Sequence, residues 1–214
     1  NNDELQKVRT KKKGYEQNDQ LIKSMTKGNE SKKLPEDLGR IIIDPETGGI
    51  RPYAALTGNV NKETQLYAKN LAQFIKGAKE VFGARVSNFE VSSFMNQLPS
   101  LLNTEQGRRV ILKQMELSNK IDALYNDTLD EALKKYSRYN YADVLNIVDD
   151  KIKKDHGDLI QDMDDVVEAS NYLDQMSENS DIFKDTVLMR NPEGKFKAVK
   201  KDKVASAPEG WRAY

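Results

Sequence analysis

One stretch of the sequence, residues 105–136, limits the fold more than any other, because apolar side chains recur in it at helical spacing. Spacings of three and four residues predict a single α-helix with one long apolar stripe. The stripe consists of Val110, Ile111, Ile121, Leu124, Tyr125, Leu129, Leu133 and Tyr136. Such a helix extends about 50 Å at 1.5 Å per residue. Two short helices cannot cover it, so we expect another subunit or a further helix against the rest.

Two shorter helices are predicted before this stretch. The first covers about residues 62–82, where the apolar side chains again follow helical spacing. The second follows a capping box formed by Ser87 and Glu90, so that it begins at Asn88, and it stops before Pro99. We expect these two helices to pack together as a short helical hairpin.

Two more helices are predicted after the long one. Asn140 is the predicted N-cap of the first, whose apolar residues continue to Ile152, and Gly157 interrupts the pattern. An acidic helix then extends from about Ile160 to Met176. The helical region as a whole spans residues 61–178.

The two ends of the chain have different patterns. Residues 1–33 are polar with isolated apolar points, which favours a frayed or partner-ordered arm. Residues 41–43 are three isoleucines, and a Pro and Gly turn with a short return segment follows them, which favours a small β-hairpin or an extended strap. Residues 186–190 and 195–199 flank an Asn-Pro-Glu-Gly turn and predict a terminal β-hairpin, closed by the tail around Trp211 and Tyr214.

These patterns predict a mainly α fold, an elongated helical bundle or hairpin with a long central helix. We divide it into an extended N-terminal arm with a short hairpin or strap (1–60), a helical domain (61–178) and a C-terminal β-hairpin with its tail (179–214). Only 37% of residues are hydrophobic and 32% are charged, which argues against one large core and for an elongated or partner-completed shape.

The net charge of zero is unevenly distributed. Residues 1–141 carry 23 basic and 18 acidic side chains, residues 142–185 carry 4 and 13, and residues 186–214 carry 7 and 3. An acidic block between two basic ones favours docking through complementary charge, although solvated helix faces give the same pattern. The lysines Lys11, Lys12 and Lys13, with Lys200 and Lys201, are candidates for nonspecific DNA contact.

Side chains for catalysis or metal binding do not converge in this sequence. His156 is the only histidine and there is no cysteine, which makes zinc ligation poor. The acidic group around Asp162 lacks the glycine and glutamate that a calcium loop requires. The glycines do not form a phosphate-binding loop. We therefore predict a protein without a catalytic centre, metal or cofactor, and the sequence contains no membrane-spanning segment.

Several segments resemble those of a known family. Residues 82–90 (FGARVSNFE), 94–101 (FMNQLPSL) and 105–109 (EQGRR), followed by a long helix, are similar to a block in virion structural proteins of tailed bacteriophages, including DNA-ejection or DNA-transfer proteins. Residues 189–195 (MRNPEGK) and the final 210–212 (GWR) are similar to C-terminal modules of such proteins. The quoted segments contain 32 of the 214 residues.

The resemblance implies a structural or assembly component of a virion, close to the portal, the neck or the head interior, and ejected with the DNA or retained. Its partners would be portal, capsid, tail or neck proteins and further copies of itself, and it would be soluble in the host cytoplasm before assembly. The alternative is a nonspecific DNA-binding or packaging accessory protein. From the apolar patterns we predict partner contacts at Ile41, Ile42, Ile43, Val110, Ile111, Ile121 and Leu124.

Overall fold

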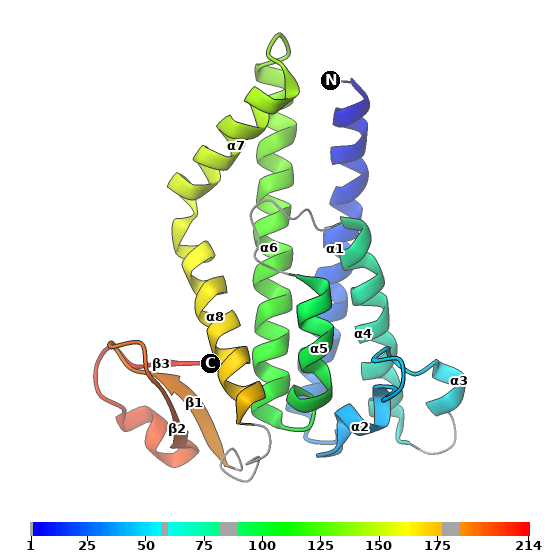
Figure 1. The fold of residues 1–214 in the computed structure, drawn as a ribbon, viewed down its shortest axis with the longest axis vertical. Coiled ribbons are helices and arrows are strands. Elements are labelled where there is room, and N and C mark those ends of the chain that lie inside the picture. The colour runs from blue at the N-terminus through cyan, green and yellow to red at the C-terminus, as the bar shows by residue number, and fades with distance from the viewer. Residues whose placement is uncertain (1, 57–59, 82–89, 177–184) are drawn as a thin grey trace.

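The computed structural model describes residues 2–56, 60–81, 90–176 and 185–214. In these ranges the chain forms eight α-helices and one small sheet of three antiparallel strands (Figure 1). The prediction of a mainly α-helical fold with a C-terminal β-hairpin is therefore confirmed.

The longest helix, α6, covers Glu105–Lys135 and lies at the centre of the molecule (Figure 1). It begins where the sequence predicts, because the hydroxyl of Thr104 accepts a hydrogen bond from the backbone N–H of Gly107 (2.9 Å). Lys134 and Lys135 place positive charge in its last turn, where the helix dipole favours it. The predicted apolar stripe thus lies on one continuous helix.

The N-terminal segment is a helix, and the prediction of an extended arm there is wrong. Helix α1 covers Asn2–Glu30 and lies antiparallel along α6, with α4 (Lys62–Val81) against its lower half. Buried residues of α1 recur with the heptad spacing of a coiled coil. They are Val8, Tyr15, Asn18, Ile22, Met25 and Asn29.

Polar residues in this heptad seam explain why the sequence pattern does not predict helix α1. Two asparagines of α6, seven residues apart, donate to two α1 carbonyl oxygens that are also seven residues apart. Asn119 Nδ2 reaches the oxygen of Tyr15 (3.0 Å), and Asn126 Nδ2 reaches that of Val8 (2.9 Å). Buried asparagines in such seams fix the register of the two helices. The helix therefore depends on polar contacts with α6 that its own apolar pattern does not reveal.

Three helices complete the lower half of the bundle. Helix α4 contributes the predicted stripe, with Leu71 and Phe74 fully buried, and α5 (Val91–Leu101) and α8 (Gly157–Gln175) pack against α6. The predicted start of α5 rests on Ser87, which lies outside the described residues. Pro99 lies inside α5 rather than after it. The buried side chains of Leu98 and Leu101 hold this last turn in place despite the hydrogen bond that proline removes.

The segment between α1 and α4 is only partly a hairpin. Leu38–Ile42 forms helix α2 because Leu38 and Ile42, one turn apart, are both fully buried, so the predicted strand is wrong for Ile41 and Ile42. Ile43 and Ile50 do pair, in an isolated antiparallel bridge across a turn. A short helix, α3 (Tyr53–Leu56), follows.

The upper part of the bundle contains α1, α6 and α7 (Tyr141–Asp155). The predicted N-cap is confirmed, because Asn140 Oδ1 accepts a hydrogen bond from the N–H of Asp143 (2.9 Å). Val144 and Val148 of α7 belong to a second, smaller apolar cluster with Val8 and residues from the end of α6. The predicted interruption at Gly157 is also present, since α8 begins there.

The C-terminal part is a three-stranded sheet docked on α8. Strands β1 (Thr186–Arg190) and β2 (Phe196–Lys200) form the predicted hairpin, and β3 (Arg212–Ala213) pairs with the other edge of β1. The short 3-10 helix η2 (Lys201–Ser206) connects β2 to the tail. Tyr214 closes the sheet as expected of the tail, because its N–H donates to the oxygen of Leu188 (2.9 Å).

Candidate functional site

A polar cleft of about 990 Å³ opens at the base of the bundle, between the helices and the C-terminal sheet. Residues from the end of α1, from α2, from the α5–α6 junction and from the start of β1 and of η2 line it. These segments are far apart in the sequence and meet only because α1 and α6 run antiparallel. We call this site the base cleft.

The floor of the base cleft contains a buried arginine. Arg108 is only 6% exposed. Its Nε donates to Asn29 Oδ1 (2.8 Å), and its Nη1 donates to the oxygen of Leu102 (2.8 Å) and to that of Pro35 (3.5 Å). All three acceptors are neutral. Burial lowers the pKa of Arg108 below its ordinary value, but a guanidinium in a protein stays protonated. A full positive charge is therefore buried at the floor.

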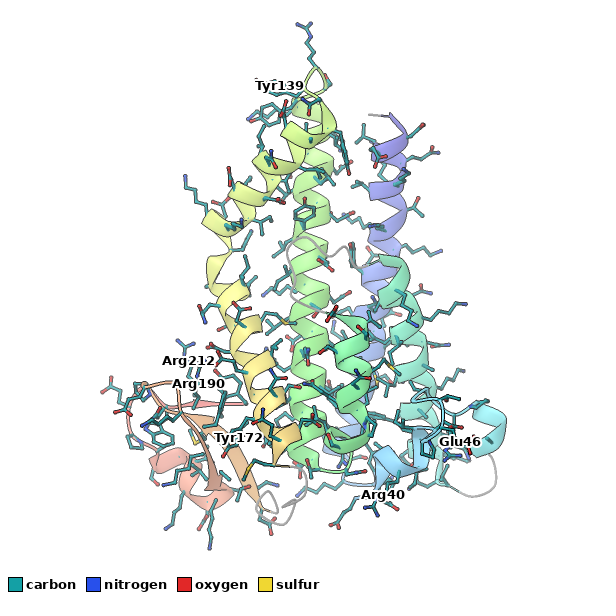
Figure 2. All side chains as sticks on the ribbon, in the orientation of Figure 1. Arg40, Glu46, Tyr139, Tyr172, Arg190 and Arg212 are labelled. Atoms are coloured by element: carbon teal, nitrogen blue, oxygen red, sulfur yellow. The ribbon has the colours of Figure 1, made fainter. Side chains whose placement is uncertain are left out.

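More charged side chains surround this floor. Glu105 accepts hydrogen bonds from Arg109 (3.1 Å) and Lys201 (3.1 Å). Burial alone would raise the pKa of Glu105, but the hydrogen bond from Lys201 and the neighbouring positive charges lower it overall. Lys32 and Arg40 are exposed at the rim and form no ion pair with any residue in the described part of the chain, and Figure 2 shows Arg40 at the base of the molecule. Two rim cations thus remain available.

Two non-glycine residues of the cleft have an uncommon backbone conformation. Lys32 (φ 55°) and Asp185 (φ 56°) both lie in the left-handed region, which costs of order 1 kcal/mol or more for such residues. Gly39, in neighbouring α2, is required for a different reason, because a Cβ there would lie 2.2 Å from the oxygen of Pro99. The backbones of α2 and α5 are therefore in close contact beside the cleft.

A second, smaller site lies in the upper half, which we call the apical groove. It has a volume of about 210 Å³ and lies among α1, α6 and α7. Its lining is mainly apolar and aromatic, and includes Val8, Tyr15, Tyr125, Leu129, Tyr141 and Leu145. Tyr139 lies above it at the tip of the α6–α7 turn and is 54% exposed (Figure 2).

The residues predicted to contact partners lie mostly in the core of this chain. Ile42, Ile43, Val110, Ile111 and Ile121 are all less than 5% exposed. The prediction that they form an uncovered surface is wrong, because α1 and the other helices cover the lower half of the stripe. The remaining two, Ile41 and Leu124, are half-buried and pack against the two clusters.

The lysines predicted to contact DNA lie at two separate places. Lys11, Lys12 and Lys13 are in the upper half of α1, and Lys12 lies 3.7 Å from Asp127. Lys200 and Lys201 are in the C-terminal part, where Lys201 is bound to Glu105. The structure does not bring the two groups into one basic surface (Figure 1). DNA contact stays a prediction.

The acidic residues around α8 have a structural role in this arrangement. Arg190 of β1 binds Asp165 and Glu168 of α8, and the Tyr214 hydroxyl donates to Asp165 (3.3 Å). His156 lies between α7 and α8. In the described ranges, no three His, Cys, Asp or Glu side chains are grouped to hold a metal ion. No helix there is long and apolar enough to cross a membrane.

The sequence alone does not indicate the base cleft. One signal was present, because Arg108 lies three and seven residues before Ile111 and Met115, which places a charge on the buried face of α6. Its acceptors come from residues 29, 35 and 102, and only the folded chain brings them together.

The fold and the two sites define a mainly helical protein with an elongated bundle, a polar base cleft and an apolar apical groove. Comparison with protein-family models, with curated proteins and with solved structures finds no match. The function therefore has to be inferred from the chain itself.

Proposed function

We propose that this chain is a structural component of a tailed-bacteriophage virion, associated with the portal, the neck or the head interior. It acts through contacts with other subunits, including copies of itself, and not through catalysis. Two of the segments that carry the resemblance, residues 94–101 and 105–109, form α5 and the first turn of α6. These two segments lie in the lower half of the bundle.

Opposite charge on opposite sides of the bundle is the observation that carries this proposal. Residues 5–15 of α1 contain five basic and no acidic side chains, and we call them the basic edge. Residues 141–175, which form α7 and α8, contain ten acidic and three basic side chains, and we call them the acidic edge. Figure 1 shows these two edges on either side of α6.

Such a distribution favours head-to-tail association of identical subunits. The basic edge of one copy attracts the acidic edge of the next, and this kind of contact generates a ring when the rotation between copies closes. A ring or shell of repeated subunits is what a portal-proximal or neck protein forms. Charge attraction between exposed edges also weakens as salt increases.

The test is to measure the mass of the purified chain by light scattering at low and high salt, about 50 mM and 500 mM. We expect oligomers at low salt and dissociation at high salt. Lys13→Glu on the basic edge and Asp150→Lys on the acidic edge should each weaken association about tenfold. Both side chains are exposed, so the fold should not change. Lys76→Glu, an exposed site on α4, is the matched control and should associate as the unaltered chain does.

Mixing the two variants distinguishes head-to-tail contact from any other. Each variant keeps one intact edge, so a mixture of Lys13→Glu and Asp150→Lys chains should associate more strongly than either variant alone. A chain that stays monomeric at every concentration, or a control that dissociates equally, contradicts the association. The virion role itself is checked by mass spectrometry of purified particles from the strain that encodes the chain, and absence from the particles contradicts it.

A further inference from the structure

No carboxylate among the described residues forms an ion pair with Arg108 at the floor of the base cleft, and Glu105 and Glu36 act on its charge only at longer range. A buried arginine is usually paired with an acid, because an uncompensated buried charge strongly destabilises the folded state. In the described part of this chain, Arg108 instead donates to one amide oxygen and two backbone carbonyl oxygens. These acceptors use Nε and Nη1 only. Nη2 donates to none of the described residues, and Arg108 lines the cleft.

The other charges of the cleft leave positive groups available. Of the carboxylates that face it, Glu105 is already bound by Arg109 and Lys201. The three others are exposed, where water screens them, and they are Glu36, Asp37 and Asp185. Lys32 and Arg40 also line the cleft, with no ion pair to any described residue. Because Arg108 is buried, water screens its charge less than the charges of the exposed side chains at the rim.

We propose that the base cleft binds a phosphate-bearing small molecule. Arg108 contacts the phosphate at the floor, and Lys32 and Arg40 contact it from the rim. A guanidinium presents its donors in a fork that matches phosphate oxygens, and charge-assisted hydrogen bonds of this kind are strong. The phosphate supplies the negative charge that Arg108 lacks.

The shape of the cleft favours an organic phosphate over the bare ion. Its volume of about 990 Å³ is within the range of pockets for drug-sized ligands, about 300–1,000 Å³. Leu34, Leu101 and Leu173 line it together with the charged groups, which gives an organic portion an apolar surface. Pyrophosphate is nevertheless a suitable probe, because it carries the recognised group alone.

The experiment is calorimetric titration of the purified chain with pyrophosphate at constant ionic strength, with citrate as an anion of similar charge but without phosphate. We expect pyrophosphate to bind with one site per chain and citrate to bind at least about tenfold more weakly, since the arginine fork matches phosphate. Arg40→Gln should weaken pyrophosphate binding about tenfold through the loss of charge-assisted hydrogen bonds. Arg138→Gln, an exposed arginine of the α6–α7 turn, is the matched control and should bind as the unaltered chain does.

Arg108 itself requires a variant that keeps its charge. Arg108→Lys retains the cation but not the fork, and its melting temperature and circular dichroism show whether the bundle still forms. If it folds, it should bind pyrophosphate at least about tenfold more weakly. Should it not fold, the Arg40→Gln result decides alone. No heat with pyrophosphate at millimolar concentration overturns the proposal, as does equal weakening by Arg40→Gln and Arg138→Gln, or tighter binding of citrate. The charge-edge variants lie outside the cleft, so this test and the association test fail independently.

Discussion

The lower and upper halves of α6 belong to one helix and differ in what surrounds them. From Gln106 to Asp122 most side chains are buried, because α1, α5 and α8 pack around the helix. Above Asp122 the buried residues narrow to a single stripe that faces α1 and α7. The stripe continues along the helix, but the number of neighbouring helices falls. We therefore expect the lower half to be the stable core and the upper half to open first.

Core truncation should show the largest difference between the halves. Leu98→Ala in the lower half removes a fully buried side chain from the main core, and Leu133→Ala removes an equally buried one from the small upper cluster. We expect losses in unfolding free energy of about 4–5 and about 2–3 kcal/mol, since the open upper half can collapse around the space. Equilibrium urea unfolding measures both. Equal losses would contradict the comparison.

Replacing the asparagine in the lower half of α6 should also cost more unfolding free energy than replacing the one in the upper half. Asn119→Ala leaves the buried Tyr15 oxygen without its second donor and should cost about 2 kcal/mol. Asn126→Ala acts closer to the end of α1, where fraying lets water reach the Val8 oxygen, and should cost about 1 kcal/mol. Urea unfolding gives the two values, and amide hydrogen exchange should show the Asn126→Ala effect confined to the upper half. A larger cost for Asn126→Ala would reverse the expected order.

Removing a helix cap tests whether a small loss of stability stays within one half of the bundle. Thr104→Ala and Asn140→Ala each remove one capping hydrogen bond and should each cost about 1 kcal/mol. Loss of the Thr104 cap should lower the protection of α6 amides in the lower half. Loss of the Asn140 cap should increase hydrogen exchange in α7 alone. Exchange that spreads to α5 and α8 in the Asn140→Ala variant would show that the halves unfold together.

Acid should weaken the contact between the C-terminal sheet and α8, and this loss of stability should be the smallest of the four predicted here. Burial by itself would raise the pKa of Asp165, but hydrogen bonds from Gln161 and Arg190 and the Arg190 charge lower it overall below its ordinary 3.8. A lowered folded pKa means that this stabilisation is complete above the unfolded pKa and is lost as pH falls below about 4 through the folded pKa. Asp165→Asn should remove this acid-dependent part, which thermal unfolding between pH 5 and pH 2, about three pH units, would show.

Parts of the fold with local signals could be predicted from the sequence. The Thr104 and Asn140 side chains mark the starts of α6 and α7, and the Asn-Pro-Glu-Gly turn marks the C-terminal hairpin. Helix α1 could not be predicted, because Asn18 and Asn29 interrupt its apolar pattern and its stabilising partners lie on α4 and α6. The base cleft was missed because the neighbours of Arg108 come from distant parts of the chain.

The unbroken length of α6 connects the two ends of the molecule mechanically. Its 31 residues form a rod of about 46 Å, from the cap at Thr104 beside the base cleft to the turn that bears Tyr139. A rod pivoting by about 5° at the Thr104 end moves its far end by about 4 Å, from its length alone. The helix thus joins the cleft rigidly to the opposite tip, so that a change in its direction at the cleft would be largest at the turn that bears Tyr139.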